Sequence, residues 1–134
     1  MVLKNITVLC IFTISVMTPS KEYFTNIKTV AFKERTPDEI KTPLAFSILC
    51  HSNLGILEAL LASVFRPHNS YCIYVDNKVP NPFLNNVKRL INAYKMRFPN
   101  SNIFLANEPR MDIYWGSSTL LEAPLSCMKQ LLKL

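Results

Sequence analysis

The sequence contains only two glycines, Gly55 and Gly116, among its 134 residues. A GxGxxG dinucleotide-binding fingerprint and a phosphate-binding P-loop each need several closely spaced glycines, so both are excluded. The GxSxG motif of serine hydrolases and the HExxH motif of zinc proteases are also absent. No acidic pair of the DxD type occurs, and we therefore expect no metal site built from paired carboxylates.

The N-terminal region lacks an apolar run of the roughly 20 residues that a membrane-spanning helix needs. Its uncharged run, residues 6–17, has 12 residues, the size of the apolar core of a signal peptide. No small-x-small cleavage site follows, so residues 1–20 are predicted to be a signal-anchor or a cleaved signal peptide. Either would direct the remainder to the secretory lumen. The alternative is a buried N-terminal strand.

Runs of one charge sign are missing as well. The net charge is +6, but the lysines and arginines are scattered, without a block of five or six. A positive balance suits an anionic ligand or surface, whereas scattered charges are typical of a mildly basic, solvated surface. We expect no nucleic-acid partner from this pattern.

Cysteines are few, and none has the spacing of zinc ligands. Cys10 lies in the N-terminal segment, which leaves Cys50, Cys72 and Cys127. In an oxidising lumen these three allow one disulfide and one thiol, or a bond to a missing partner. Their spacing does not select a pair.

The remaining chain divides at about residue 43. Residues 21–42 are polar and of mixed charge, and we interpret them as a stem or linker with one short helix. Beyond them, strands are predicted at 44–50, 71–75 and 103–105, and apolar side chains at helical spacing predict helices between them. Ser52 or Asn53 is expected to cap the first of these helices. Alternating strands and helices predict an α/β fold with a parallel sheet of the nucleotide-binding class.

The C-terminal segment contains conflicting helix signals. Thr119 and Glu122 have capping-box spacing, but Pro124 would then lie inside the helix, at a cost of about 3 kcal/mol. The helix should therefore begin nearer Pro124 or be kinked. Three strand–helix units without the second half of the domain form an incomplete sheet. Residues 43–134 are therefore predicted to be the N-terminal part of a larger domain.

The stretch YCIYVDNK, residues 71–78, places Asp76 where a strand leaves the sheet. In open α/β sheets, ligands bind outside the carboxyl ends of the strands. Aspartate also commonly opens a turn through its own side chain. The residues alone favour the turn and leave the ligand-binding role open.

The segments PLAFSILCHSNLGILEALLASVFRPHNSYCIYVDNK and WGSSTLLEAPLSCMKQLL resemble glycosyltransferase family 14. This family contains the core 2 and I-branching β-1,6-N-acetylglucosaminyltransferases and the peptide xylosyltransferases. The resemblance covers residues 43–134 in several ordered blocks. It implies a Rossmann-like glycosyltransferase A-type domain, of which this chain would hold the nucleotide-binding half, in a type II Golgi membrane protein.

The resemblance also implies a site for the UDP-sugar donor. Asp76 would hydrogen-bond the uridine, and Trp115 falls where the family has an aromatic residue near the nucleotide-sugar. From the chemistry of its ring we infer that Trp115 would stack there. Carried over by position, the donor-binding residues are Leu49, Cys50, His51, Asp76, Asn77, Lys78 and Trp115.

A disulfide follows from the same resemblance, which implies a bond between Cys72 and Cys127 and leaves Cys50 outside it. Pro124 departs from the acidic residue that the family usually has in this helix. The local geometry around the LSCMK segment is therefore expected to differ from that of the family.

The activity that the resemblance implies is transfer of N-acetylglucosamine from UDP-GlcNAc to O-glycans of glycoproteins in β-1,6 linkage. The family mechanism is an inverting displacement with a glutamate base and no metal cofactor. The glutamate and the basic residues that stabilise the leaving UDP belong to the family's carboxyl-terminal half, so no catalytic residue is named in this chain. The alternatives are a protein xylosyltransferase and an inactive, truncated lumenal binding protein. The expected location is the lumenal side of the Golgi membrane, with secretion as the alternative.

Overall fold

The computed structural model describes residues 7–12 and 36–134, which form four strands and four helices. Residues 1–6 and 13–35, including most of the predicted stem, lie outside the described residues. The strands are β1 (Thr7–Phe12), β2 (Leu44–Cys50), β3 (Ser70–Val75) and β4 (Asn102–Leu105). The helices are α2 (Pro37–Lys41), α3 (Leu54–Val64), α4 (Asn81–Arg97) and α5 (Thr119–Leu131).

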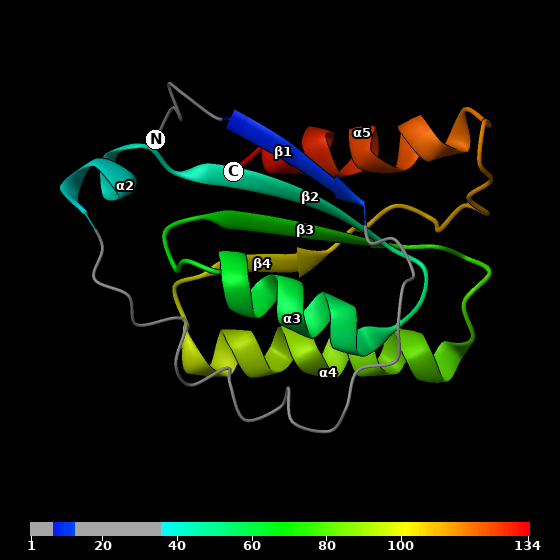
Figure 1. Ribbon diagram of the computed structural model, residues 1–134, viewed down its shortest axis with the longest axis horizontal. Coiled ribbons are helices and arrows are strands. Elements are labelled where there is room, and N and C mark those ends of the chain that lie inside the picture. Colours follow the sequence, from blue (N-terminus) through cyan, green and yellow to red (C-terminus); the bar gives the residue numbers. More distant parts are fainter. Residues whose placement is uncertain (1–6, 13–35) are drawn as a thin grey trace.

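The strands form one parallel sheet in the order β1-β2-β3-β4. Helices α3 and α4 cover one face of this sheet, and α5 lies on the other (Figure 1). The structure therefore confirms the expected α/β class and the three predicted strands, and it adds a fourth strand at the edge. The arrangement agrees with the front part of a Rossmann-like glycosyltransferase domain.

The core under α3 and α4 is rich in aromatic rings. Phe65, which is 1% exposed, stacks on Tyr71 with ring centroids 5.2 Å apart. It also packs against Tyr94 at 4.6 Å and Phe98 at 5.1 Å. One side chain thus joins the end of α3 to β3 and α4.

The core under α5 is smaller and contains a disulfide. Cys72 of β3 is bonded to Cys127 of α5, with the two Cα atoms 5.5 Å apart. This is the pair that the family resemblance implies. Both half-cystines are fully buried among residues of β2, β3 and α5. Cys50 is a buried thiol on the opposite face of the sheet.

Two helix starts follow their local sequence. Asn53 caps α3 as expected: its side chain accepts a hydrogen bond from the Ile56 amide at 3.4 Å, and its φ of 55° is left-handed. Asparagine tolerates this conformation better than most residues. Helix α2, the short helix expected in the linker, starts with a reciprocal capping box between Thr36 and Glu39.

The capping-box spacing of Thr119 and Glu122 does not produce a capping box in α5. The helix begins at Thr119 after an N-cap at Ser118 that makes no side-chain capping bond. The Thr119 hydroxyl is instead used in the preceding loop, where it accepts from the Tyr114 amide at 3.4 Å. The start is not shifted toward Pro124, which lies inside the helix, buried against the sheet. The Ser47 hydroxyl of β2 donates to the Pro124 carbonyl at 3.4 Å, so tertiary contacts stabilise the helix at this point.

The N-terminal segment contributes β1 to the sheet. Thr7–Phe12 pairs in parallel with β2, in the register Thr7 with Leu44 through Phe12 with Leu49. The prediction of a signal-anchor or signal peptide at residues 1–20 otherwise falls on residues outside the described ones. Among the helices of the described residues, none has the length and apolar character needed to cross a bilayer.

Candidate functional site

Polar residues gather at the edge of the sheet where β2, β3 and β4 end. His51 follows β2, Asp76 follows β3, and the loop of residues 106–118 follows β4. Because all strands are parallel, their carboxyl ends meet at one edge, and Figure 1 shows the connecting loop running from there to α5. This is the position at which open α/β sheets bind ligands.

Asp76 anchors this edge. Its side chain is buried, and Oδ1 accepts hydrogen bonds from the Lys78 amide at 2.9 Å and from the Ile113 amide at 3.4 Å. The bond to Lys78 closes the turn that the sequence favoured. The bond to Ile113 spans 37 residues and ties the turn to the loop before α5. The carboxylate therefore orders two separate segments of backbone.

Lys78 partly covers the Asp76 carboxylate. Its ammonium lies 3.6 Å from Asp76 Oδ2 and also donates to the Ile113 carbonyl. The same nitrogen lies 4.2 Å from the centroid of the Tyr114 ring, a cation–π geometry. The Lys78 side chain is 43% exposed, so it is the part of this cluster that solvent or a ligand meets first.

Further bonds fix the loop of residues 106–118 over the sheet edge. The Tyr74 hydroxyl accepts from the Met111 amide at 2.8 Å and donates to the Pro109 carbonyl at 3.2 Å. Burial raises the pKa of Tyr74, so this hydroxyl keeps its proton at neutral pH. The loop is thus held from beneath by a strand residue.

The turn after Asp76 makes additional contacts with this loop. Asn77 donates from its backbone to the Met111 carbonyl at 3.1 Å and from its side chain to Asp112 Oδ1 at 2.9 Å. The Arg110 guanidinium donates to the Asp76 carbonyl at 3.3 Å. Arg110, Asp112 and Tyr114 were not predicted. Their signal in the sequence was a polar, aromatic loop directly after a strand.

The residues implied by the resemblance fall into two groups. The structure brings Asp76, Asn77 and Lys78 together at the sheet edge. Leu49 and Cys50 are buried on opposite faces of β2, so a ligand at the edge would meet their backbone and not their side chains. His51 is half-buried at the end of β2, and Trp115 is 78% exposed in the loop before α5. Neither side chain joins the hydrogen-bonded cluster around Asp76.

No group of three or more His, Cys, Asp or Glu side chains that could hold a metal ion occurs in the described part of the chain. The charged groups at the sheet edge are instead paired with one another and with backbone groups, as the bonds of Asp76 and Lys78 show.

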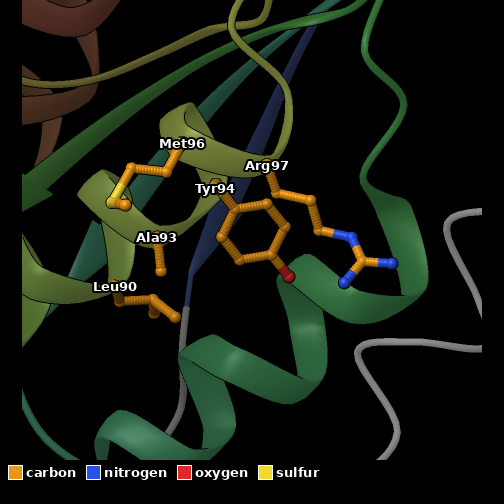
Figure 2. Close-up of a pocket in the computed structure, with 5 residues that line it drawn as sticks. All are labelled: Leu90, Ala93, Tyr94, Met96 and Arg97. Carbon is orange, nitrogen blue, oxygen red and sulfur yellow. The ribbon is translucent and has the colours of Figure 1, made fainter.

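A separate hollow lies on α4, away from this edge. Figure 2 shows its lining, which comes from the carboxyl-terminal half of the helix: Leu90, Ala93, Tyr94, Met96 and Arg97. The buried Tyr94 hydroxyl has no hydrogen-bond partner within the described residues. Burial, together with the nearby Glu58 carboxylate, raises the pKa of Tyr94 to about 12.

Glu58 of α3 is predicted to lower stability at neutral pH. Burial raises the pKa of its carboxyl above the usual 4.5, so ionisation costs more in the folded than in the unfolded chain. The native chain therefore loses stability as pH rises from about 4.5 through the folded-state pKa. We expect Glu58→Gln to have the higher Tm at pH 7 and no advantage below about pH 4. Thermal melts at both pH values check this, with the exposed Glu122→Gln as control; a lower Tm for Glu58→Gln at pH 7 would contradict it.

Comparison with known proteins identifies the chain's relatives. Residues 44–134 match the model of the family described as Core-2/I-Branching enzyme. The human beta-1,3-galactosyl-O-glycosyl-glycoprotein beta-1,6-N-acetylglucosaminyltransferase 3 is 34% identical over 96 residues, which are 72% of this chain and 20% of that protein. The human N-acetyllactosaminide beta-1,6-N-acetylglucosaminyl-transferase is 34% identical over 94 residues, 70% of this chain and 22% of that protein.

A viral relative has the same degree of similarity. The beta-1,3-galactosyl-O-glycosyl-glycoprotein beta-1,6-N-acetylglucosaminyltransferase of bovine herpesvirus 4 is 34% identical over 96 residues, again 72% of this chain and 20% of that protein. The chain thus spans about a fifth of the length of these relatives. The family match covers the sheet edge, its loop and α5, and the chain belongs to the Core-2/I-branching enzyme family.

Proposed function

We propose that this chain is the donor-nucleotide-binding part of a β-1,6-N-acetylglucosaminyltransferase that uses UDP-GlcNAc. Family membership and the activities for which the relatives are named support the reaction class. The observation that carries the proposal is the Asp76 carboxylate, fixed at the carboxyl edge of the sheet by the Lys78 and Ile113 amides. A hydrogen-bond acceptor held rigidly at this edge can recognise a nucleotide base.

The chemistry of uridine fits such an acceptor. The N3–H of uracil is a hydrogen-bond donor, and a carboxylate has up to four lone-pair sites on its two oxygens. Asp76 uses Oδ1 for two backbone amides, and Oδ2 faces the ammonium of Lys78, whose side chain is 43% exposed. Displacement of Lys78 would open Oδ2 to the base and would release a cation toward the diphosphate. Arg110 lies beside the same carbonyl end of β3 and adds positive charge there.

The acceptor would be an O-glycan of a glycoprotein, and the transfer an inverting one that needs no metal. The chemical step would depend on a base supplied by the remaining four-fifths of a family-length protein. We place the protein in the secretory pathway, on the lumenal side of the Golgi membrane. The Cys72–Cys127 bond supports an oxidising compartment.

UDP binding by the 134-residue chain tests the proposal directly. We expect isothermal titration calorimetry to detect binding of UDP to the chain. ADP should bind more weakly than UDP, because adenine has no N3–H donor. EDTA should leave the affinity unchanged.

Asp76→Asn is expected to weaken UDP binding by about tenfold, equivalent to about 1.4 kcal/mol, since a neutral amide replaces a charge-assisted acceptor. The matched control is Asp38→Asn, which removes the same charge from the exposed helix α2. Equal affinities of both variants and the native chain would remove Asp76 from the site. Absence of UDP binding by a correctly folded native chain would contradict the proposed function.

A further inference from the structure

Strand β3 contains two buried tyrosines whose side chains lie on opposite faces of the sheet. Tyr71 belongs to the core under α3 and α4, and Tyr74 to the core under α5. Each hydroxyl accepts a hydrogen bond from a backbone amide and donates one to a backbone carbonyl. The two side chains therefore make the same kinds of bond and differ in the segment that they hold.

Tyr71 holds the end of helix α3. Its hydroxyl accepts from the Arg66 amide at 2.6 Å and donates to the Val64 carbonyl at 2.9 Å. Val64 is the last residue of α3, and Tyr71 lies near the start of β3, whereas Asp76 follows the other end of the strand. The bonds of Tyr71 are therefore remote from the candidate donor site.

Tyr74 holds the loop of residues 106–118 at the candidate donor site. Its hydroxyl donates to the Pro109 carbonyl at 3.2 Å and accepts from the Met111 amide at 2.8 Å. The residue between these two contacts is Arg110, whose guanidinium donates to the Asp76 carbonyl at 3.3 Å. One hydroxyl thus fixes the loop backbone on both sides of a cation at the sheet edge.

The loop contacts the Asp76 turn directly after this anchor. The Met111 carbonyl accepts from the Asn77 amide at 3.1 Å, and the Ile113 amide donates to Asp76 Oδ1 at 3.4 Å. A hydrogen bond of 3.4 Å is long and holds its partners weakly. The placement of the Ile113 amide against the carboxylate therefore depends on the anchoring of the loop two residues earlier, at Tyr74.

We propose that Tyr74 is a positioning residue for donor binding, because its hydroxyl holds the loop of residues 106–118 against the Asp76 carboxylate. This inference rests on the proposed function. Tyr74 is 1% exposed beneath the loop, so it acts through the Met111 and Ile113 backbone and not by contact with the nucleotide. Without the hydroxyl, the Met111 amide and the Pro109 carbonyl lose their partner, and the loop must move toward water to satisfy them.

Phenylalanine at either position separates donor positioning from general stability. Tyr74→Phe and Tyr71→Phe each keep a buried ring and remove a hydroxyl that binds two backbone groups, so both should lower the urea midpoint to a similar extent. In isothermal titration calorimetry we expect Tyr74→Phe to weaken UDP binding by about tenfold, and Tyr71→Phe to stay within about twofold of the native chain.

Trp115 gives a separate readout of the loop, because it is the only tryptophan of the chain and is 78% exposed within this loop. Greater motion of the loop depolarises tryptophan fluorescence. In the absence of UDP, the fluorescence anisotropy of Trp115 should therefore fall in Tyr74→Phe and keep its native value in Tyr71→Phe. Destabilisation alone would not distinguish the two variants.

The outcomes separate this inference from the proposed function. If a folded Tyr74→Phe variant bound UDP as tightly as the native chain, Tyr74 would have no positioning role and the proposed function would stand. Equal losses of affinity in the two variants, or the same Trp115 anisotropy in all three chains, would overturn the inference in the same way. If the native chain bound no UDP, the proposed function and the inference would both be wrong.

Discussion

Replacing Cys72 and Cys127 together with alanine is expected to lower the free energy of unfolding by about 4 kcal/mol. The bond joins two residues with a sequence separation of 55. In the chain-entropy model, loss of this cross-link raises the conformational entropy of the unfolded chain and so stabilises the unfolded state by about 4 kcal/mol. Because α5 packs on the sheet through the same cystine, we also expect the loop that contains Ile113 to lose order. Urea unfolding of the oxidised proteins measures the energy.

Cys50→Ala is the matched control for this double variant. Cys50 is equally buried but lies outside the bond, so its replacement should cost about 1 kcal/mol and leave the cross-link intact. Reduction with dithiothreitol should destabilise the native chain and Cys50→Ala, and should not change the double variant. A double variant as stable as the native oxidised chain would show that the bond contributes nothing to the fold.

Phe65→Ala should destabilise the opposite core by a similar amount, about 4 kcal/mol. The substitution removes a fully buried ring at the junction of α3, β3 and α4, where Tyr71, Tyr94 and Phe98 all contact it. The cost combines the lost transfer energy of the ring with the cavity left among side chains that cannot collapse into it. Urea unfolding measures it, with an unchanged slope against urea as the check that the unfolded states are comparable.

Met96→Ala, in one of the two helices on the same face of the sheet, is the control for Phe65→Ala. Its side chain is 83% exposed at the hollow on α4, so we expect a change within about 0.5 kcal/mol. If Phe65→Ala cost no more than Met96→Ala, the aromatic cluster would not be the centre of this core.

The sequence predicted the central residue of the candidate site but not the loop residues that surround it. Asp76 followed from one local pattern, a β-forming run that ends in a carboxylate, and the structure places it at the carboxyl edge of the sheet. The loop partners were not predictable, because Ile113, Met111 and Asp112 lie 34 to 37 positions further along the chain than the turn residues they contact. The family resemblance added Cys72 and Cys127, a choice that residue spacing left open.

Local signals determined the secondary structure of residues 44–134 almost completely. Alternation of apolar runs and helical periodicity depends on neighbours within a few residues, so β2, β3, β4, α3 and α4 could all be located from the printed sequence. The α/β class followed from their alternation. The cap of α3 at Asn53 was likewise a local choice, made by one side chain and an amide three residues away.

The tertiary structure decided the features in which local rules conflict. Pro124 disfavours a helix by itself, yet burial against β2 and the nearby cystine keep it within α5. The pairing of Thr7–Phe12 with the outer edge of β2 likewise depends on contacts between segments that are distant in the sequence. The sequence by itself thus determined the elements, because their stabilising contacts are close along the chain. Only the packed structure decided the placement of α5, the partners of Asp76 and the occupant of the sheet edge, since those depend on contacts between distant segments.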